Sequence, residues 1–495
     1  MEDHPRPRVH KACDACGRRK VRCNGQQRCQ QCEHMGLVCT YTDNRLARSR
    51  KHALRRGEVI SKHKIESSSN ALLAPALSPV STSYFESLIP EYMHFVYPFN
   101  PIMTEDELQD AVRKMDSDRE NAAFVYAFAA ATIDLAQSNR PTSSASTHIT
   151  QLVNQAIETQ PPMFLGFRPS ILRTMTNIFI QMCFMSLGQY DLGFIYLREA
   201  ITMIHLLRIE DKTALASLNP TERARRQRLY WLCFIHERFM SIVHFSPATL
   251  SPHASFPEAD PTLAPGISQG WTQVIKTFLL LEPTFINLWI GDRSQVSAKW
   301  VEKKYQELDD ARWELEVSML SETQQADLVI TRQWMRTLLW QMAMSNWLLS
   351  SRAPCPSLSL ELPLRLSGQL RQFLTKISQN TIRVHGSSIL TKLVEIINTI
   401  ADVVIHLPQA TMEQTTSRIG DIVFMKSVVF SFHNLQQVSK DILLEKFCLI
   451  RDRFPGIEAA CQLTIGPIIF LNIKTSPLKC RVPPITLQMI QRLLK

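Results

Sequence analysis

The chain has 495 residues, of which 45% are hydrophobic and 20% are charged, and its formal net charge is +10. The excess charge is local, because residues 1–64 contain 16 basic and 6 acidic side chains and the rest of the chain is balanced. A neutral body of this size excludes a histone-like protein and a wholly disordered chain. The small basic head predicts a polyanionic partner, with nucleic acid first and an anionic membrane second.

The sequence shows no segment for secretion or membrane insertion. Residues 1–16 are polar and charged, without the apolar stretch of a secretory signal. The longest apolar run, near Ala122–Ala136, is too short to cross a bilayer. We therefore expect an intracellular protein without a membrane partner, in which thiols are reduced or bound to metal.

Six of the twelve cysteines are clustered near the N-terminus, where the pattern C-x2-C-x6-C occurs twice. The six residues are Cys13, Cys16, Cys23, Cys29, Cys32 and Cys39. A Cys-x2-Cys pair at the start of a helix places two sulfurs on one face, close enough to bind one ion. A segment of about 40 residues cannot bury an adequate apolar core, so the metal must supply folding energy.

Six thiolates complete two tetrahedral zinc ions if two of the thiolates bridge the metals. Cys13 and Cys29 occupy equivalent places in the duplication and are the expected bridging pair. One zinc then takes the first three cysteines and Cys29, and the other takes the last three and Cys13. A four-cysteine zinc ribbon leaves Cys23 and Cys39 unexplained. A disulfide framework is disfavoured by the missing secretory signal.

The basic residues continue beyond the cysteines. Residues 43–66 form a basic linker that can serve as a nuclear-import signal, as phosphate contacts or as a plain solvated segment. Leu46, Ala53 and Ile60 recur every seven residues, which makes only a weak coiled coil. Residues 67–84 are rich in serine and proline and predict a disordered linker.

Residues 85–495 predict a large all-α domain. Apolar residues recur at three- and four-residue steps, and strand patterns with tight glycine turns are absent from the sequence. The predicted helices are Glu105–Met115, Ala122–Gln137, Ile171–Gly188, Phe194–Ile209, Glu222–Val243, Trp271–Leu281, Ser294–Met319, Gln324–Leu349, Ile389–Ile405, Ile422–Arg453 and Thr486–Leu494. The fold class is therefore a small zinc-nucleated two-helix cluster, residues 1–42, joined to an all-α body.

The segment from Ala12 to Asn24, which reads ACDACGRRKVRCN, resembles the fungal binuclear zinc-cluster family of transcription factors. That resemblance implies two Zn²⁺ ions and a short helix that reads CGG-type triplets in the major groove. It places the base contacts on Arg19 and Lys20. Basic residues nearby supply phosphate contacts by position and charge, and these are Arg18, Arg22 and Arg28.

Parts of the helical body resemble the middle homology region of fungal transcription regulators. The segments that carry this resemblance are Tyr97–Ile102, Tyr190–Ala200, Arg225–Trp231 and the pair Glu237-Arg238. The resemblance implies a regulatory domain. In that family, inhibition, effector response or dimerisation is assigned to this region.

Together these features predict a nuclear, sequence-specific transcription factor of RNA polymerase II genes. We expect it to regulate a metabolic gene cluster, with secondary metabolism as one candidate. The expected partners are double-stranded DNA with GC-rich triplets, co-regulators or the transcription machinery and, as one option, a second copy of the chain. Regulation of carbohydrate use and zinc-dependent RNA binding are the alternatives. Phosphate-binding and hydrolase motifs are missing from the sequence, so we expect no enzyme.

Overall fold

The computed structural model describes residues 12–19, 21–34, 38–41, 81–136, 145–163, 166–291, 293–346, 348–350, 353, 355–407 and 411–454. The chain divides into two compact units, Met1–Val80 and Ser81–Lys495. Within the described part the elements are helices, apart from one isolated bridge between Ser350 and Ser359. The fold class is thus a small cysteine-rich unit and an all-α body.

The N-terminal unit contains two short helices, α1 (Asp14–Arg19) and α2 (Gln30–His34), each of which begins directly after the first cysteine of a C-x2-C pair. Five cysteines and Ala15 form its buried cluster, with Val21, Cys39 and Tyr41 packed against them. The N–H group of Asp14 donates to the carbonyl of Thr40 at 2.8 Å, which ties the two ends of the unit together. A core made almost entirely of sulfur depends on what the sulfur binds.

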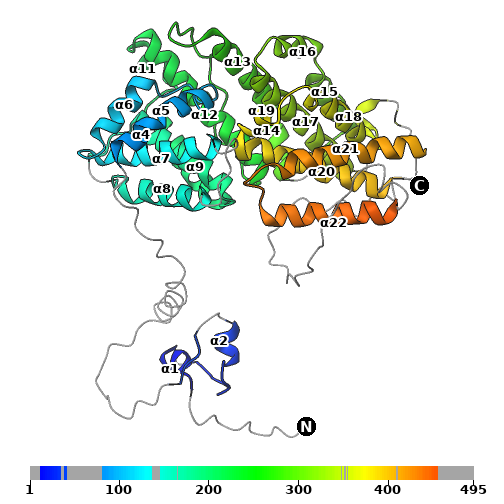
Figure 1. Cartoon of the computed structure of the whole chain (residues 1–495), viewed down its shortest axis with the longest axis horizontal. Coiled ribbons are helices and arrows are strands. Elements are labelled where there is room, and N and C mark those ends of the chain that lie inside the picture. Colours follow the sequence, from blue (N-terminus) through cyan, green and yellow to red (C-terminus); the bar gives the residue numbers. More distant parts are fainter. Residues whose placement is uncertain are drawn as a thin grey trace. The chain divides into compact units, whose positions relative to one another are not determined.

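The first half of the body contains nine helices in the described segments (Figure 1). They are α4 (Thr82–Ser87), α5 (Ile89–Phe95), α6 (Glu105–Lys114), α7 (Arg119–Ala136), α8 (Ala145–Thr159), α9 (Ile171–Ser186), α10 (Tyr190–Leu206), α11 (Lys212–Ala216) and α12 (Pro220–Val243). Helix α7 packs between α8 and α9. Rings of Tyr92, Phe124, Phe128 and Phe179 meet there with centroids 5.3–6.3 Å apart, and they form the core of this half.

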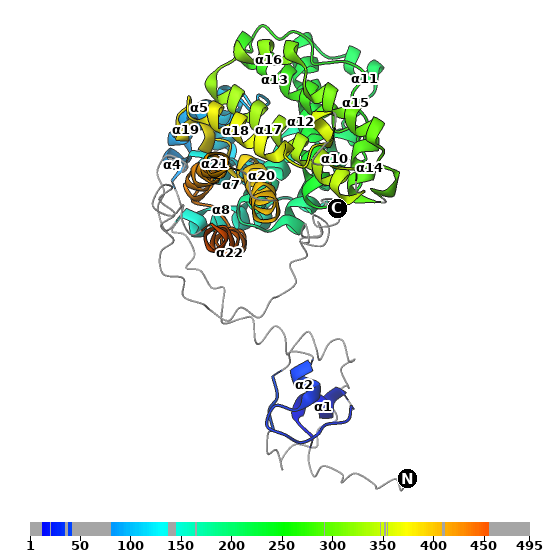
Figure 2. The same cartoon turned by 90° about the vertical axis from the view of Figure 1, so that its right-hand side faces the viewer.

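The second half is also helical. Its elements are α13 (Pro265–Leu279), α14 (Pro283–Ile290), η2 (Arg293–Gln295), α15 (Ala298–Leu308), α16 (Ala311–Ser318), α17 (Glu322–Ser345), η3 (Pro356–Leu358), α18 (Leu362–Leu374), α19 (Gln379–Arg383), α20 (Gly386–His406), α21 (Met412–Phe430) and α22 (Gln437–Arg453). Helix α17 packs on α20 and carries the buried Trp334 and Trp340. Helices α20, α21 and α22 lie side by side in both views (Figures 1 and 2).

Two predicted helices are each broken in the structure. The segment Ser294–Met319 contains η2, α15 and α16, because Asp310 leaves the helix and accepts a hydrogen bond from the N–H group of Arg312 as an N-cap. The segment Ile422–Arg453 is divided between α21 and α22. The turn between them docks on α9, where Asn434 and Gln436 donate to Ser186.

Other elements also differ from the sequence pattern. The pattern missed α8 and α18, whereas α4 begins at Thr82, within the segment predicted as a linker. The predicted helix Thr486–Leu494 and the linker residues 43–80 lie outside the described residues. Among the described residues, no helix is long and apolar enough to cross a membrane.

Helix α12 binds the loop that follows it, residues 247–260, through side chains of the segment Arg225–Trp231, which resembles the family's middle homology region. Arg228 is buried, donates to the carbonyl of Pro101 at 2.9 Å and pairs with Asp260 at 2.9 Å. The hydroxyl of Tyr230 donates to the carbonyl of Ser251, and the indole N–H of Trp231 donates to the carbonyl of Ser255. The motif is thus explained by loop attachment within the body.

Asp134, at the end of α7, should make the stability of the body depend on pH. Only 4% of this residue is exposed, and burial raises the pKa of its carboxyl to about 7 although the Ser186 hydroxyl donates to it at 2.6 Å. The unfolded carboxyl ionises near pH 4, so its stabilising contribution is complete below that pH and is lost as pH rises to about 7.

We therefore expect Asp134→Asn to gain stability relative to the unchanged protein between pH 4 and pH 7, by at least about 1 kcal/mol. Denaturant unfolding of both proteins at several pH values measures the difference. A difference that stays constant across this range would contradict the assignment.

Candidate metal centre and nucleic-acid interface

Four buried sulfurs are gathered at the centre of the N-terminal unit. The ligand atoms of Cys13, Cys16, Cys29 and Cys32 all lie within 4.8 Å of one another. Each residue is fully buried, so water cannot compete freely for these positions. Four convergent sulfurs suit a tetrahedral thiophilic ion such as zinc.

The distances between individual sulfurs give Cys13 and Cys29 a special place. These two sulfurs are 3.7 Å apart, the Cys13 sulfur is 3.5 Å from that of Cys32, and the Cys29 sulfur is 3.5 Å from that of Cys16. Two sulfurs on one tetrahedral zinc are separated by about 3.8 Å, because each Zn–S bond is about 2.3 Å. Cys13 and Cys29 thus each approach two sulfurs of the other half, whereas Cys16 and Cys32 each approach one, and this is the arrangement expected of bridging ligands.

The third cysteine of each half is held against the first. The N–H group of Cys13 donates to the sulfur of Cys23 at 3.5 Å, and the N–H group of Cys29 donates to the sulfur of Cys39 at 3.2 Å. The two halves of the duplication therefore have matching geometry. The sulfurs of Cys23 and Cys39 lie outside the group of four, which is also the ligand set of the ribbon alternative, and their place beside the cluster is given by these two hydrogen bonds.

The electrostatics of the sulfurs depend on a cation. Burial raises the pKa of Cys32 to about 12 and raises the pKa of Cys13 and Cys16 as well, so protein atoms alone favour the thiols. Cys23 differs: burial opposes ionisation, but N–H donors from Cys13 and Gly25 lower its pKa to about 6. Zinc at the centre stabilises thiolates, so metal binding releases protons.

The structure describes the predicted DNA-contacting residues only in part. The backbones of Arg18 and Arg19 form the end of α1, while their side chains and the whole of Lys20 lie outside the described residues. Arg22 is exposed, and so is Arg28, whose φ of 76° places it in the turn between the two halves. The structure therefore fixes the helix that would carry the base contacts, but not the contacts themselves.

Comparison with known proteins agrees with this geometry. Residues 11–48 match the model of the Fungal Zn(2)-Cys(6) binuclear cluster domain. The N-terminal unit is thus a binuclear zinc-cluster domain with two zinc ions as cofactors, of the kind found in fungal transcription regulators.

Several fungal proteins are similar to this chain over most of its length. The probable sucrose utilization protein SUC1 of Candida albicans is 22% identical over 426 residues, covering 83% of this chain and 82% of the relative. The maltose fermentation regulatory protein MAL13 of Saccharomyces cerevisiae is 23% identical over 404 residues, covering 79% and 84%. The respiratory transcription factor ZNF1 of the same yeast is 21% identical over 445 residues, covering 89% and 93%. The chain is therefore similar along most of its length to fungal regulatory proteins, one of them named as a transcription factor.

Proposed function

We propose that this protein is a nuclear, sequence-specific transcription factor that binds double-stranded DNA through α1 and regulates RNA polymerase II genes. The observation that carries the proposal is the binuclear cluster domain at residues 11–48, with its convergent sulfurs. All six cysteines of the cluster serve as zinc ligands, with Cys13 and Cys29 in both coordination shells. The metals hold α1 rigidly, which a segment this short cannot do alone.

In this proposal the end of α1 reads the bases of CGG-like triplets. Arg19 and Lys20 donate to O6 and N7 of guanine in the major groove, a pattern that distinguishes G·C from the other pairs. Arg18, Arg22 and Arg28 contact phosphates and set the register of the cluster on the duplex. Support for these roles comes from their position after Cys16 and around the cluster, and from the exposure of Arg22 and Arg28.

The target genes are proposed to serve carbohydrate use. Relatives that cover most of the chain are named for sucrose utilization and maltose fermentation, which favours sugar metabolism over a secondary-metabolite cluster. The helical body then supplies the control of recruitment, with co-regulators or a second copy of the chain as its partners.

A selection from random duplexes with the zinc-loaded full chain tests DNA reading, and Lys20→Ala tests the base contact. We expect enrichment of CGG-like triplets, and for Lys20→Ala a loss of about tenfold or more in preference for the selected motif over scrambled DNA. A fixed spacing between two triplets would identify a dimer.

The matched control is Arg28→Ala, which removes a proposed phosphate contact. It should weaken binding to both duplexes equally and reduce the salt slope by about 0.9. Equal losses on both duplexes for Lys20→Ala would reassign that residue to the phosphates, and no enriched motif at all would contradict autonomous DNA reading.

A further inference from the structure

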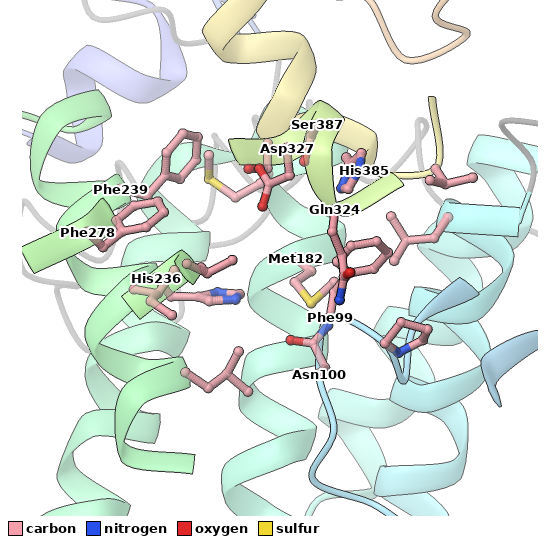
Figure 3. Close-up of a pocket in the computed structure, with 18 of the residues that line it drawn as sticks. Phe99, Asn100, Met182, His236, Phe239, Phe278, Gln324, Asp327, His385 and Ser387 are labelled. Atoms are coloured by element: carbon pink, nitrogen blue, oxygen red, sulfur yellow. The ribbon is translucent and has the colours of Figure 1, made fainter. Parts of the chain in front are cut away.

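The body contains a cavity where its two halves meet. It has a volume of about 150 Å³ and is lined by residues of α7, α9, α12, α13, α17 and α20 and of the loop at residues 98–100 (Figure 3). One water needs about 10–15 Å³ on this measure, so the cavity has room for about ten small atoms. That is the size of one substituted six-membered ring.

The cavity has aromatic walls and a polar lining. Phe239 on α12 and Phe278 on α13 lie on one side, and Phe99 lies across the gap (Figure 3). Trp271 lines the cavity from α13. Such rings pack well against the apolar faces of a flat ring-shaped ligand. Polar side chains converge between these walls, so the lining does not suit a purely apolar guest.

Asn100 presents its side-chain amide to the cavity. The residue is 96% buried, and no hydrogen bond among the described residues involves this amide, which faces the cavity (Figure 3). The amide does not belong to the fully enclosed polar atoms that lack a partner, so it can be reached from the cavity. A ligand that both donates and accepts hydrogen bonds would satisfy both of its polar atoms.

The other polar groups mostly present hydrogen-bond acceptors. The Nδ1–H group of His236 donates to the Gln181 amide oxygen at 2.7 Å, which leaves Nε2 as an acceptor. The Nε2–H group of His385 donates to the Thr323 carbonyl at 2.9 Å, which leaves Nδ1 as an acceptor. Burial lowers the pKa of both rings, that of His236 to about 4, so both are neutral near pH 7.

Apart from the two histidines, three acidic or basic side chains line the cavity: Lys392 and Asp327 pair with each other, and Asp134 accepts a hydrogen bond from the Ser186 hydroxyl at 2.6 Å. The ammonium of Lys392 lies 3.3 Å from Oδ1 of Asp327 and donates to the Thr331 hydroxyl at 2.6 Å. The hydrogen bonds that described residues give to Asp327 go to Oδ1, so Oδ2 remains as a further acceptor. An anionic ligand would find no free cation among these groups, and a cationic one would compete with Lys392.

We propose that this cavity binds a small, uncharged, polyhydroxylated ring compound, such as a monosaccharide or a cyclitol. Hydroxyl donors meet the acceptors of His236, His385 and Asp327, Asn100 contributes an amide, and the aromatic walls cover the apolar face. Binding itself is independent of the proposed function, whereas the role of the compound as an effector rests on it.

The position of the cavity suggests how binding would act. Its lining joins α9 and α12 of the first half to α17 and α20 of the second, so an occupant stabilises one packing of the halves. Gly386 helps to form this junction, since its φ of +59° starts α20 and a Cβ there would lie 2.7 Å from the Leu135 side chain. A ligand that prefers one arrangement shifts the population toward it.

Thermal unfolding and titration calorimetry of the zinc-loaded full chain, without DNA, test the proposal. The probes are D-glucose and myo-inositol, with gluconate as an anionic control and cyclohexanol as an apolar one. We expect saturable stabilisation by at least one neutral polyol and none by the two controls. Binding of gluconate or cyclohexanol alone, or of no probe, would overturn the proposed ligand class.

Asn100→Leu should weaken polyol binding at least tenfold without lowering the melting temperature of the ligand-free protein, because the amide has no partner to lose. If the substitution by leucine prevents folding, Asn100→Ala replaces it as the test variant. Asn398→Leu is the control at an asparagine away from the cavity, since its side-chain oxygen is buried without a partner and does not line the cavity. Unchanged affinity in Asn100→Leu would refute the site. Because DNA is absent, failure of DNA selection and failure of polyol binding are separate results.

Discussion

Replacement of Cys29 by alanine should remove both zinc ions and unfold the N-terminal unit. The Cys29 sulfur lies 3.7 Å from that of Cys13 and 3.5 Å from that of Cys16, so its loss leaves each metal with three thiolates. Structural zinc contributes about 10–16 kcal/mol in small zinc-dependent domains, and the core of this unit offers little else. DNA binding should disappear with the metal, while the helical body stays folded.

Zinc content per chain after gel filtration measures the effect. We expect two ions in the unchanged protein and none in Cys29→Ala, with circular dichroism reporting that the body is retained. Cys183→Ala is the matched control, because this cysteine is buried in α9 within the other unit and should leave both ions in place. One tightly held zinc in Cys29→Ala would refute the bridging role and favour a mononuclear site.

The cluster could be predicted from the sequence because its chemistry is local. Two copies of one cysteine spacing within residues 13–39 predict the metal and the start of both helices, and the structure brings four of the six predicted ligands together. The special place of Cys13 and Cys29 followed from the internal symmetry, and the sulfur distances support it. Such spacing arguments work where a metal binds residues that are close in the chain.

The long helices of the body were also predictable, whereas their ends were less so. Periodicity identified α6, α9 and α12 to within a few residues. It could not locate the break before α16 or the turn after α21, because apolar residues continue through both. The cause of the second break is tertiary, since Asn434 and Gln436 gain partners on α9 only after the chain has folded.

The cavity could not be predicted from the sequence at all. Asn100 lies in a loop, His236 on α12 and His385 before α20, and no spacing connects them. The pair His236-Glu237 shows the same limit. The two residues are neighbours in the sequence, but His236 lines the cavity, whereas Glu237 is buried in a hydrogen-bond network. Only the packing of α12 decides which of these two residues lines the cavity and which is buried in the network.

Replacement of Glu237 by alanine should be the most destabilising single change in the body. Glu237 is 1% exposed and pairs with Arg198 at 2.5 Å and with Arg238 at 3.1 Å. It also accepts hydrogen bonds from the N–H groups of Thr249 and Leu250 at 2.8 and 2.9 Å. Alanine leaves Arg238, itself 1% exposed, as a buried charge without its carboxylate, and it releases the loop after α12. Removing one partner of a buried ion pair costs about 3–5 kcal/mol.

Chemical denaturation of the full chain, followed by tryptophan fluorescence, measures this loss in the free energy of unfolding. Glu316→Ala is the matched control, because Glu316 is half exposed and its pair with Lys276 at 2.9 Å lies at the surface, where water and salt screen it, so its loss should change stability little. Glu237→Gln should lie between the two, since its amide keeps one acceptor for the loop but cannot balance the charge of Arg238. The zinc content should stay unchanged in all three variants. A loss below about 1 kcal/mol in Glu237→Ala would mean that water or a rearranged loop satisfies Arg238, and that the network does not hold the segment after α12 in place.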